Sequence, residues 1–192
     1  MTKIGVILGS TRPNRNGAQV AQWVLELARA REDAQFELVD LRDFPLPHLD
    51  EPLPPSLGQY QHEHTRRWAA KIASFDGFVI VTPEYNHSTS GVLKNALDYL
   101  YAEWNNKAVG FVSYGSVGGA RAVEHLRLVA GELQMADVRQ QVALSLVTEF
   151  ENYSTFRPGE YNVSPLSTLL DQVVAWSNAL APLRAAPSHA AA

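Results

Sequence analysis

A short polar segment near the N-terminus carries the residue types that bind phosphate. An apolar run at residues 4–9 is followed by Ser10, Thr11 and Arg12, and a helical pattern begins at Gly17. Free backbone N–H groups and the positive end of the dipole make a helix start a natural anion site. Hydroxyl groups and a guanidinium add donors. The segment is typical of a phosphate-binding loop, although an ordinary strand-to-helix turn would share these features.

Two common nucleotide-binding loops do not match this segment. A Walker loop needs Gly, four further residues and then Gly-Lys-Ser or Gly-Lys-Thr, and the chain contains no such string. The dinucleotide fingerprint Gly-x-Gly-x-x-Gly is missing as well, because Thr11 and Arg12 stand where closely spaced glycines are required. A mononucleotide or sugar phosphate remains as the ligand, and Asn16 is expected to be the N-cap of the helix that follows.

Two later segments are suited to a planar ligand. Pro83, Glu84, Tyr85 and Asn86 follow a β-branched run and offer backbone N–H groups and an aromatic ring. Residues 113–119 read Ser-Tyr-Gly-Ser-Val-Gly-Gly, and their glycines permit positive φ and close approach of a flat ring to the main chain. Each segment alone would also fit a tight turn. Together with the first loop, they indicate one binding site if the fold brings them to the same edge.

Hydrophobic periodicity predicts five strands that alternate with helices. Strands are expected at residues 3–8, 36–40, 77–82, 107–114 and 138–146. Helices are expected at residues 17–31, 62–74, 90–100, 119–133 and 164–183. The proline-rich stretch 44–55 can be neither helix nor central strand, and its length suggests a loop over a site or an interface.

This alternation is typical of an α/β protein with a parallel sheet and helices on both faces. Right-handed crossovers leave a few doubly wound orders, of which 2-1-3-4-5 suits five strands with the phosphate loop after the first. Ligands of such sheets bind beyond the carboxyl ends of the strands, near the switch in winding direction. The loops after strands 1, 3 and 4 are therefore predicted to form one site.

Composition places the chain among ordinary globular proteins. Its 192 residues are 46% hydrophobic and 19% charged, and they fit one domain over residues 1–184 with a flexible tail at 185–192. A net charge of -4 gives no sign of nucleic-acid binding, and the lack of cysteine excludes thiolate metal sites and a cysteine nucleophile. No apolar run is long enough for a signal peptide or a membrane span, so a cytoplasmic location is expected.

Three motifs together resemble the NADPH-dependent FMN reductase family. They are Gly-Ser-Thr-Arg at residues 9–12, Pro-Glu-Tyr-Asn at 83–86 and Ser-x-Gly-x-x-Gly-Gly at 113–119. The resemblance covers the chain from residue 3 to about residue 183, and it is most specific where Ser-Gly-Val-Leu-Lys-Asn follows at 90–95. Members of this family are flavodoxin-like flavoproteins, related to bacterial quinone, chromate and azo-dye reductases.

The resemblance implies a bound FMN and matches particular residues to it. The positions that hold the FMN phosphate correspond to Ser10, Arg12, Asn16, Gly17 and Gln19. Many relatives have serine where this chain has Asn16. The segment along the isoalloxazine ring corresponds to Pro83, Glu84, Tyr85 and Asn86. The loop on the other side of the ring corresponds to Ser113, Gly115, Ser116, Gly118 and Gly119.

The resemblance also implies a reaction. NADPH or NADH passes a hydride to N5 of the flavin, and backbone N–H groups of residues 113–119 stabilise the charge that develops toward N1 and O2. A small electron acceptor then replaces the nicotinamide, which gives ping-pong kinetics. No residue is assigned to proton transfer and no metal is expected. Homodimers or homotetramers are implied, with Lys94, Asn95 and Asp98 at the dimer contact.

Several other polar residues have two interpretations. Glu84 is expected in a loop or subunit contact rather than as a general base. His87 fits a substrate contact or a solvated loop, and Arg15 fits a contact to the 2′-phosphate of NADPH or a solvated loop. His62 and His64 are not expected to bind metal, because residues two apart on a helix do not face each other.

Some questions stay open on the sequence alone. Tyr99, Tyr101 and Trp104 fit core packing, a dimer interface or an acceptor pocket. The stretches 44–55 and 148–161 are expected to shape the acceptor side. A flavodoxin-like electron carrier, reduced by a protein partner, is the alternative function. The physiological acceptor and the preference for NADPH or NADH are not decided by any motif.

Overall fold

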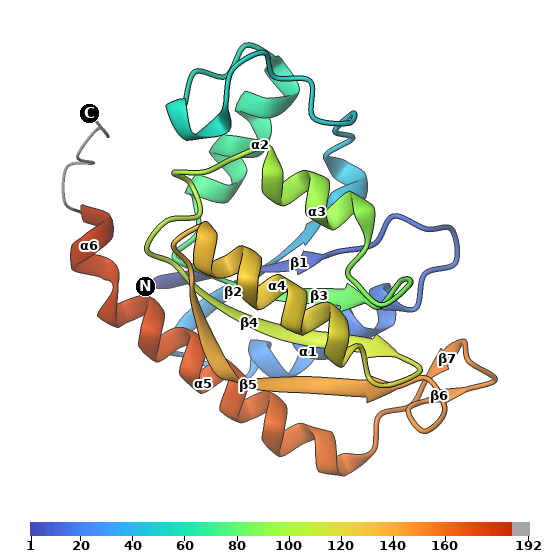
Figure 1. Cartoon of the computed structure of the whole chain (residues 1–192). Coiled ribbons are helices and arrows are strands. Elements are labelled where there is room, and N and C mark those ends of the chain that lie inside the picture. The colour runs from blue at the N-terminus through green and yellow to red at the C-terminus, as the bar shows by residue number, and fades with distance from the viewer. Residues whose placement is uncertain (186–192) are drawn as a thin grey trace.

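A computed structural model describes residues 1–185 of the chain. Its main sheet has five parallel strands in the order β2-β1-β3-β4-β5, so the predicted doubly wound topology is confirmed (Figure 1). The strands are β1 (Thr2–Leu8), β2 (Ala34–Asp40), β3 (Gly77–Pro83), β4 (Ala108–Gly115) and β5 (Ala136–Ser145). The helices are α1 (Gly17–Arg29), α2 (Glu63–Ala73), α3 (Gly91–Asp98), α4 (Ala120–Glu132), α5 (Val163–Ala179) and α6 (Ala181–Ala185).

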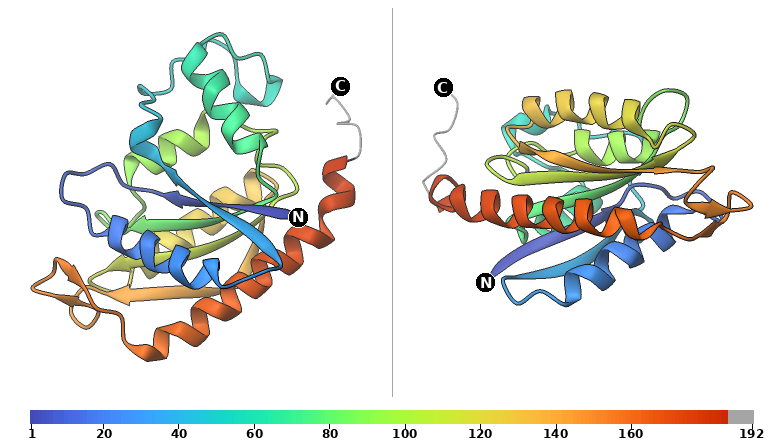
Figure 2. Two further views of the ribbon diagram at one scale, coloured as in Figure 1. Left: turned by 180° about the vertical axis from the view of Figure 1, so that it is seen from behind. Right: turned by 90° about the horizontal axis from the view of Figure 1, so that it is seen from below.

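Helices cover both faces of the sheet (Figure 2). Successive side chains of a strand point to opposite faces, so β3 contributes Val79 and Val81 to the core under α1 and α5. The same strand contributes Phe78 and Ile80 to the core under α2, α3 and α4. Every residue of β3 is buried, as expected for the central strand of a sheet covered on both sides.

Element boundaries differ from the prediction at the C-terminal side of several helices and at the starts of β2 and β5, each of which begins two residues earlier than predicted. Helix α1 ends at Arg29, two residues early. The predicted closing helix is broken into α5, which ends at Ala179, and α6, which begins at Ala181. Ala185, the first residue of the predicted tail, still belongs to α6. Residues 186–192 lie outside the described residues, and the division into one domain and a tail stays a prediction.

A small antiparallel hairpin follows β5 at the same end of the molecule as the loop after β1 (Figure 1). It pairs β6 (Phe150–Glu151) with β7 (Thr155–Phe156). The Glu149 carboxylate, 2% exposed, accepts hydrogen bonds from the backbone N–H of Gly159, the hydroxyl of Tyr161 and the amide of Asn162. These bonds tie the segment after the hairpin to the end of β5.

Of the three aromatic residues that follow α3, Tyr99 and Trp104 belong to the core and Tyr101 is partly buried against it. Tyr99 and Trp104 have no exposed surface, and the Trp104 indole donates to the carbonyl of Leu97 at 3.1 Å. The proline-rich connection runs beside α3, where Asn95 donates to the carbonyl of Pro47 at 2.7 Å. Among the described residues, none of the helices is long and apolar enough to cross a bilayer.

Candidate functional site

Three loops meet at the carboxyl edge of the sheet, as the strand order predicts (Figure 1). They follow the neighbouring strands β1, β3 and β4, and hydrogen bonds connect them directly. The Gly9 N–H donates to the carbonyl of Val81 at 2.9 Å, and the Glu84 N–H donates to the carbonyl of Tyr114 at 3.0 Å. The hydroxyl groups of Ser10 and Tyr85 lie 3.0 Å apart. The residues predicted to hold a phosphate and a planar ring are therefore adjacent.

In the first loop, the backbone carbonyl oxygens accept hydrogen bonds from side chains. Ser90 Oγ donates to the carbonyl of Gly9, Arg15 to that of Ser10, and Arg42 to those of Thr11 and Arg12. The C=O and N–H of a trans peptide point in opposite directions. The N–H groups of these peptides, those of Ser10, Thr11 and Arg12, therefore face away from these side chains, and Pro13 has no N–H. The Arg12 N–H lies 3.4 Å from Ser10 Oγ, whereas the N–H groups of Ser10 and Thr11 bond to no described residue and can bind an anion.

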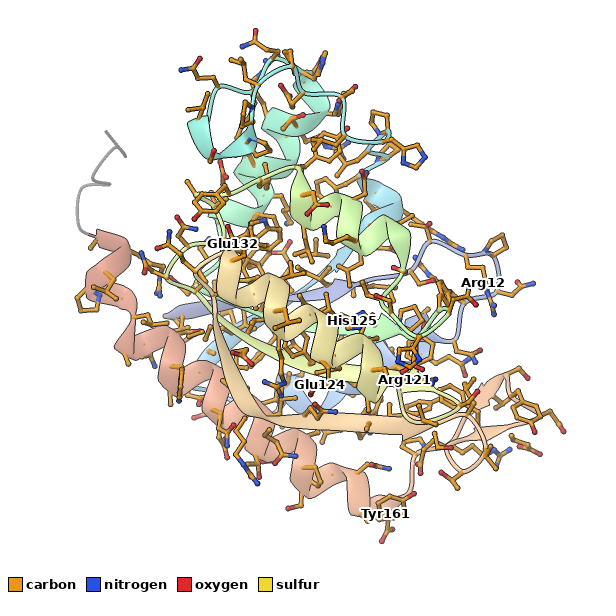
Figure 3. The ribbon with its side chains drawn as sticks, viewed as in Figure 1. Arg12, Arg121, Glu124, His125, Glu132 and Tyr161 are labelled. Carbon is orange, nitrogen blue, oxygen red and sulfur yellow. The ribbon has the colours of Figure 1, made fainter. Side chains whose placement is uncertain are left out.

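Arg15 holds this loop through the carbonyl of Ser10. Neither role expected for it from the sequence, a contact to the 2′-phosphate of NADPH or a solvated loop residue, is correct. Its side chain is 6% exposed and forms a two-pronged ion pair with Asp40 at the end of β2. Burial raises the pKa of Asp40, but the hydrogen bonds and charges of Arg15 and Arg42 outweigh burial and hold that pKa below its usual value. Arg12, in contrast, is exposed and forms no ion pair with any described residue (Figure 3). Its guanidinium is available to an anion.

The start of α1 differs from the prediction in how its polar side chains are used. Asn16 stands at the N-cap position, but its backbone is helical and its side chain makes no cap bond, so its predicted capping role is wrong. Its amide donates instead to the carbonyl of Tyr153 at 2.8 Å. The Gln19 amide donates to Ser154 and accepts from the N–H of Phe156 at 3.0 Å. Both side chains hold the β6–β7 hairpin against the helix.

A tight turn shapes the second loop. Tyr85 and Ser88 exchange backbone hydrogen bonds of 2.9 and 3.1 Å, and the two residues between them have positive φ: 48° at Asn86 and 74° at His87. Two positive φ values define a type I′ turn, for which asparagine is a favoured residue. Asn86 is therefore explained by its backbone conformation, and the turn positions the Tyr85 ring beside Ser10.

Glu84 makes a structural ion pair that joins this loop to the start of α4, which confirms the expected loop contact. Its carboxylate is 4% exposed and accepts from the Arg121 side chain and, at 3.1 Å, from the Arg121 N–H at the start of α4. Burial raises the pKa of Glu84, but the bonds and charge of Arg121 outweigh burial and keep that pKa below its ordinary value. An ionised carboxylate held this way is a poor general base. Arg121 also bonds His87 Nδ1 at 3.1 Å.

The conformation of the third loop, residues 113–119, depends on its glycines. Gly118 and Gly119 have φ of 71° and 76°, and a Cβ at Gly119 would lie 2.7 Å from that of Ser113. The Ser113 hydroxyl is buried and donates to the carbonyl of Gly118 at 2.7 Å, so it holds the loop from inside. Ser116 is exposed at the tip. Among these predicted site residues, Ser116 is accessible, whereas Ser113, Gly115, Gly118 and Gly119 are buried.

Sequence reasoning missed several residues that build the site. Arg42 and Arg121 contact the loops but lie outside the recognised motifs, and Tyr114 lies within the third motif at a position to which no role was assigned. The alternation along β4, which puts Tyr114 on the same face as Val112, was a signal that could have found the tyrosine. A cleft of about 310 Å³ beside the first loop was also not predicted; it is lined by residues including Thr11, Phe44, Leu46 and Val92.

The reason given against a histidine pair on α2 is wrong. His62 precedes the helix in an extended conformation, so its ring stacks on that of His64 with centroids 5.1 Å apart. His64 Nε2 lies 3.0 Å from the Asp50 carboxylate. The described residues nevertheless contain no group of three or more His, Asp or Glu side chains arranged for a metal ion.

The fold and the donor-rich loop at its carboxyl edge define a flavodoxin-like protein that binds a phosphorylated ligand. Residues 2–149 match the model of the family described as NADPH-dependent FMN reductase, and the chain belongs to this family. It is 47% identical over 146 residues to an NAD(P)H-dependent FMN reductase of Schizosaccharomyces pombe, covering 75% of this chain and 73% of that protein. It is 36% identical over 147 residues to a 2-hydroxy-1,4-benzoquinone reductase of Burkholderia, covering 72% and 75%.

A solved structure agrees with this assignment at the level of the fold. The NAD(P)H:(acceptor) oxidoreductase FerB of Paracoccus denitrificans superposes with a TM-score of 0.73 and 22% identity. The match covers 93% of this chain and 98% of that one. The predicted family and fold are both confirmed.

Proposed function

We propose that the protein is an FMN-dependent oxidoreductase that takes hydride from NAD(P)H and reduces a small acceptor such as a quinone or a flavin. The observation that carries the proposal is the first loop, whose carbonyls at residues 9–12 are engaged by side chains while Arg12 stays free. A dianionic phosphate is the ligand for such a donor set. Relatives whose names state FMN and NAD(P)H as reactants support the choice of cofactor.

The residues present fit FMN. Ser10, Arg12 and the first N–H groups of α1 would hold the phosphate, with Asn16, Gly17 and Gln19 around them. Bound FMN supplies the redox chemistry, taking two electrons with a hydride and passing them to an acceptor. The main chain of Pro83–Asn86 and of the loop around Gly115, Ser116, Gly118 and Gly119 would orient the ring. Arg121 fixes the first of these segments through Glu84.

The chain's contribution to catalysis is then positioning and electrostatics. With FMN bound, N–H groups of the third loop would stabilise the negative charge that develops on the flavin, and the glycines would let that main chain come close. Glu84, ionised and paired, moves no proton. Exchange of nicotinamide for acceptor at one open face gives the proposed ping-pong kinetics. A homodimer or homotetramer and a cytoplasmic location stay predictions.

Anaerobic titration tests the proposal. The purified protein is mixed with FMN, freed of excess, and titrated with NADPH and then NADH while flavin absorbance is followed. We expect FMN to be retained and its absorbance to bleach with one equivalent of reduced nicotinamide. In steady-state assays with a quinone as acceptor, double-reciprocal plots of rate against donor concentration should give parallel lines. Retained FMN that does not bleach would favour the electron carrier. Failure to retain FMN would contradict the assignment of the phosphate loop.

A further inference from the structure

The hydroxyl of Tyr114 is a buried polar group without a partner. Tyr114 is 6% exposed, and its hydroxyl makes no hydrogen bond with any described residue. Polar groups buried in folded proteins are nearly always paired, and an unpaired one destabilises the fold. Phenylalanine would fill the same space without that cost. The hydroxyl therefore calls for an explanation beyond packing.

The Tyr114 side chain, near the end of β4, reaches the first residue of α1, the helix that follows the phosphate loop. A Cβ on Gly17, the first residue of α1, would lie 2.6 Å from the Tyr114 hydroxyl oxygen. Any larger residue at position 17 would displace this hydroxyl from the helix start. The glycine thus leaves room for the tyrosine to reach the group of N–H donors that opens α1.

The groups that surround the hydroxyl can donate but have little capacity to accept. The Ser10 carbonyl is taken by Arg15, and the Ser10 hydroxyl oxygen lies 3.4 Å from the N–H of Arg12 and 3.0 Å from the hydroxyl of Tyr85. Burial raises the pKa of Tyr114, and the adjoining Tyr85 adds to this effect. Together they outweigh the Gly17 N–H, the Arg12 charge and the Ser10 hydroxyl, which favour the phenolate, so the phenol keeps its proton at neutral pH. The site therefore contains a fixed O–H donor that lacks an acceptor.

We infer that the Tyr114 hydroxyl donates a hydrogen bond to a phosphate oxygen of the bound flavin nucleotide. The inference rests on the proposed function and adds a phosphate ligand from the end of β4, at a position of the third motif to which the resemblance assigns no contact. The bond forms only when an anion enters, so the hydroxyl is an unpaired donor in the free protein and a paired one in the complex. Tyr114 then favours phosphorylated flavin over riboflavin.

Flavin binding to Tyr114→Phe tests the inference. Dissociation constants for FMN and for riboflavin are measured by quenching of flavin fluorescence, and stability of the flavin-free protein by urea unfolding. We expect FMN affinity to fall about 10-fold, the loss of one hydrogen bond to a charged group, with riboflavin affinity unchanged. The flavin-free variant should unfold at the same or a higher urea concentration, because it loses an unpaired group and no hydrogen bond.

Tyr101→Phe is the matched control. The Tyr101 hydroxyl accepts from Gln134 at 3.1 Å, away from the phosphate loop, so both flavin affinities should stay unchanged. Equal weakening of FMN and riboflavin by Tyr114→Phe would overturn the inference, since the tyrosine would then act on the ring or the packing. Unchanged FMN affinity would overturn it too. If the unaltered protein binds riboflavin but gains nothing from the phosphate, the proposed phosphate site itself fails.

Discussion

At the scale of single residues, two arginines of the phosphate loop have opposite surroundings. Arg12 is exposed, and Arg15 is buried against Asp40. We expect Arg12→Ala to weaken FMN binding about 10- to 100-fold, the value of hydrogen bonds to a charged partner, and to leave the flavin-free protein as stable as before.

Arg15→Ala should lower the free energy of unfolding by about 3 kcal/mol, because the Asp40 carboxylate loses its buried partner.

Fluorescence quenching by FMN and urea unfolding of the flavin-free protein separate these two effects. The assignment would be contradicted if Arg12→Ala lowered stability while FMN affinity held. The sequence could identify Arg12 but not the role of Arg15, because the two stand in the same polar segment. What separates them is Asp40, a residue from the end of β2 that only the folded sheet brings near.

At the scale of elements, the β6–β7 hairpin depends on α1. The Gln19 side chain accepts from the N–H of Phe156 and donates to the carbonyl of Ser154. We expect Gln19→Ala to speed amide exchange at Phe156 by about 30-fold, because the two lost hydrogen bonds each contribute about 1 kcal/mol to the hairpin's local stability. Hydrogen exchange followed by NMR measures this directly.

Gln22→Ala is the control for that experiment. Gln22 lies on the same helix, where its amide reaches Glu26 at 3.1 Å, so the substitution changes helix propensity equally and leaves the hairpin alone. Exchange at Phe156 that is the same in both variants would show that Gln19 does not hold the hairpin. FMN titration of Gln19→Ala shows separately whether this side chain also contributes to phosphate binding.

The same scale explains what could be predicted from the sequence. Strands β1, β3 and β4 are short apolar runs, and β2 and β5 at the sheet edges mix apolar with polar residues. The number and order of the strands therefore follow from hydrophobic periodicity and crossover handedness. The two-residue strands β6 and β7 are too short to show any period. The site loops were located because their motifs end strands. The contacts of Arg42, Arg121 and Tyr114 could not be predicted, because each joins residues at least 30 positions apart in the chain.

At the scale of the whole molecule, Lys107 is buried at the end of the sheet opposite the site. It precedes β4, is 5% exposed and donates to the carbonyl of Ile72 at 2.8 Å. No carboxylate of the described residues forms an ion pair with it. Burial, with the charge of Arg184 adding to it, lowers the pKa of Lys107 to about 8. The folded protein therefore bears the cost of a poorly compensated cation.

The destabilisation caused by the buried Lys107 charge decreases as pH rises. The pKa of Lys107 is about 8 in the folded protein and about 10.4 in the unfolded chain, so between these values the unfolded chain binds more protons. The contribution of Lys107 to stability is then lowest below pH 8 and rises as pH increases toward 10.4. We expect Lys107→Met to remove a penalty of about 3 kcal/mol at pH 7, a gain relative to the unaltered protein that shrinks steadily above pH 8.

Urea unfolding of both proteins from pH 7 to pH 10 measures that difference. Loss of the bond to Ile72 shifts the whole curve by a constant and leaves its slope unaffected. The raised pKa values of Tyr60 and Tyr114 also cancel, because both proteins share those residues. Lys94→Met removes an exposed lysine paired with Asp98, and its effect should be flat over this range. A Lys107→Met difference that is equally flat would show that the buried lysine titrates as in water, and that the sheet tolerates its charge at no cost.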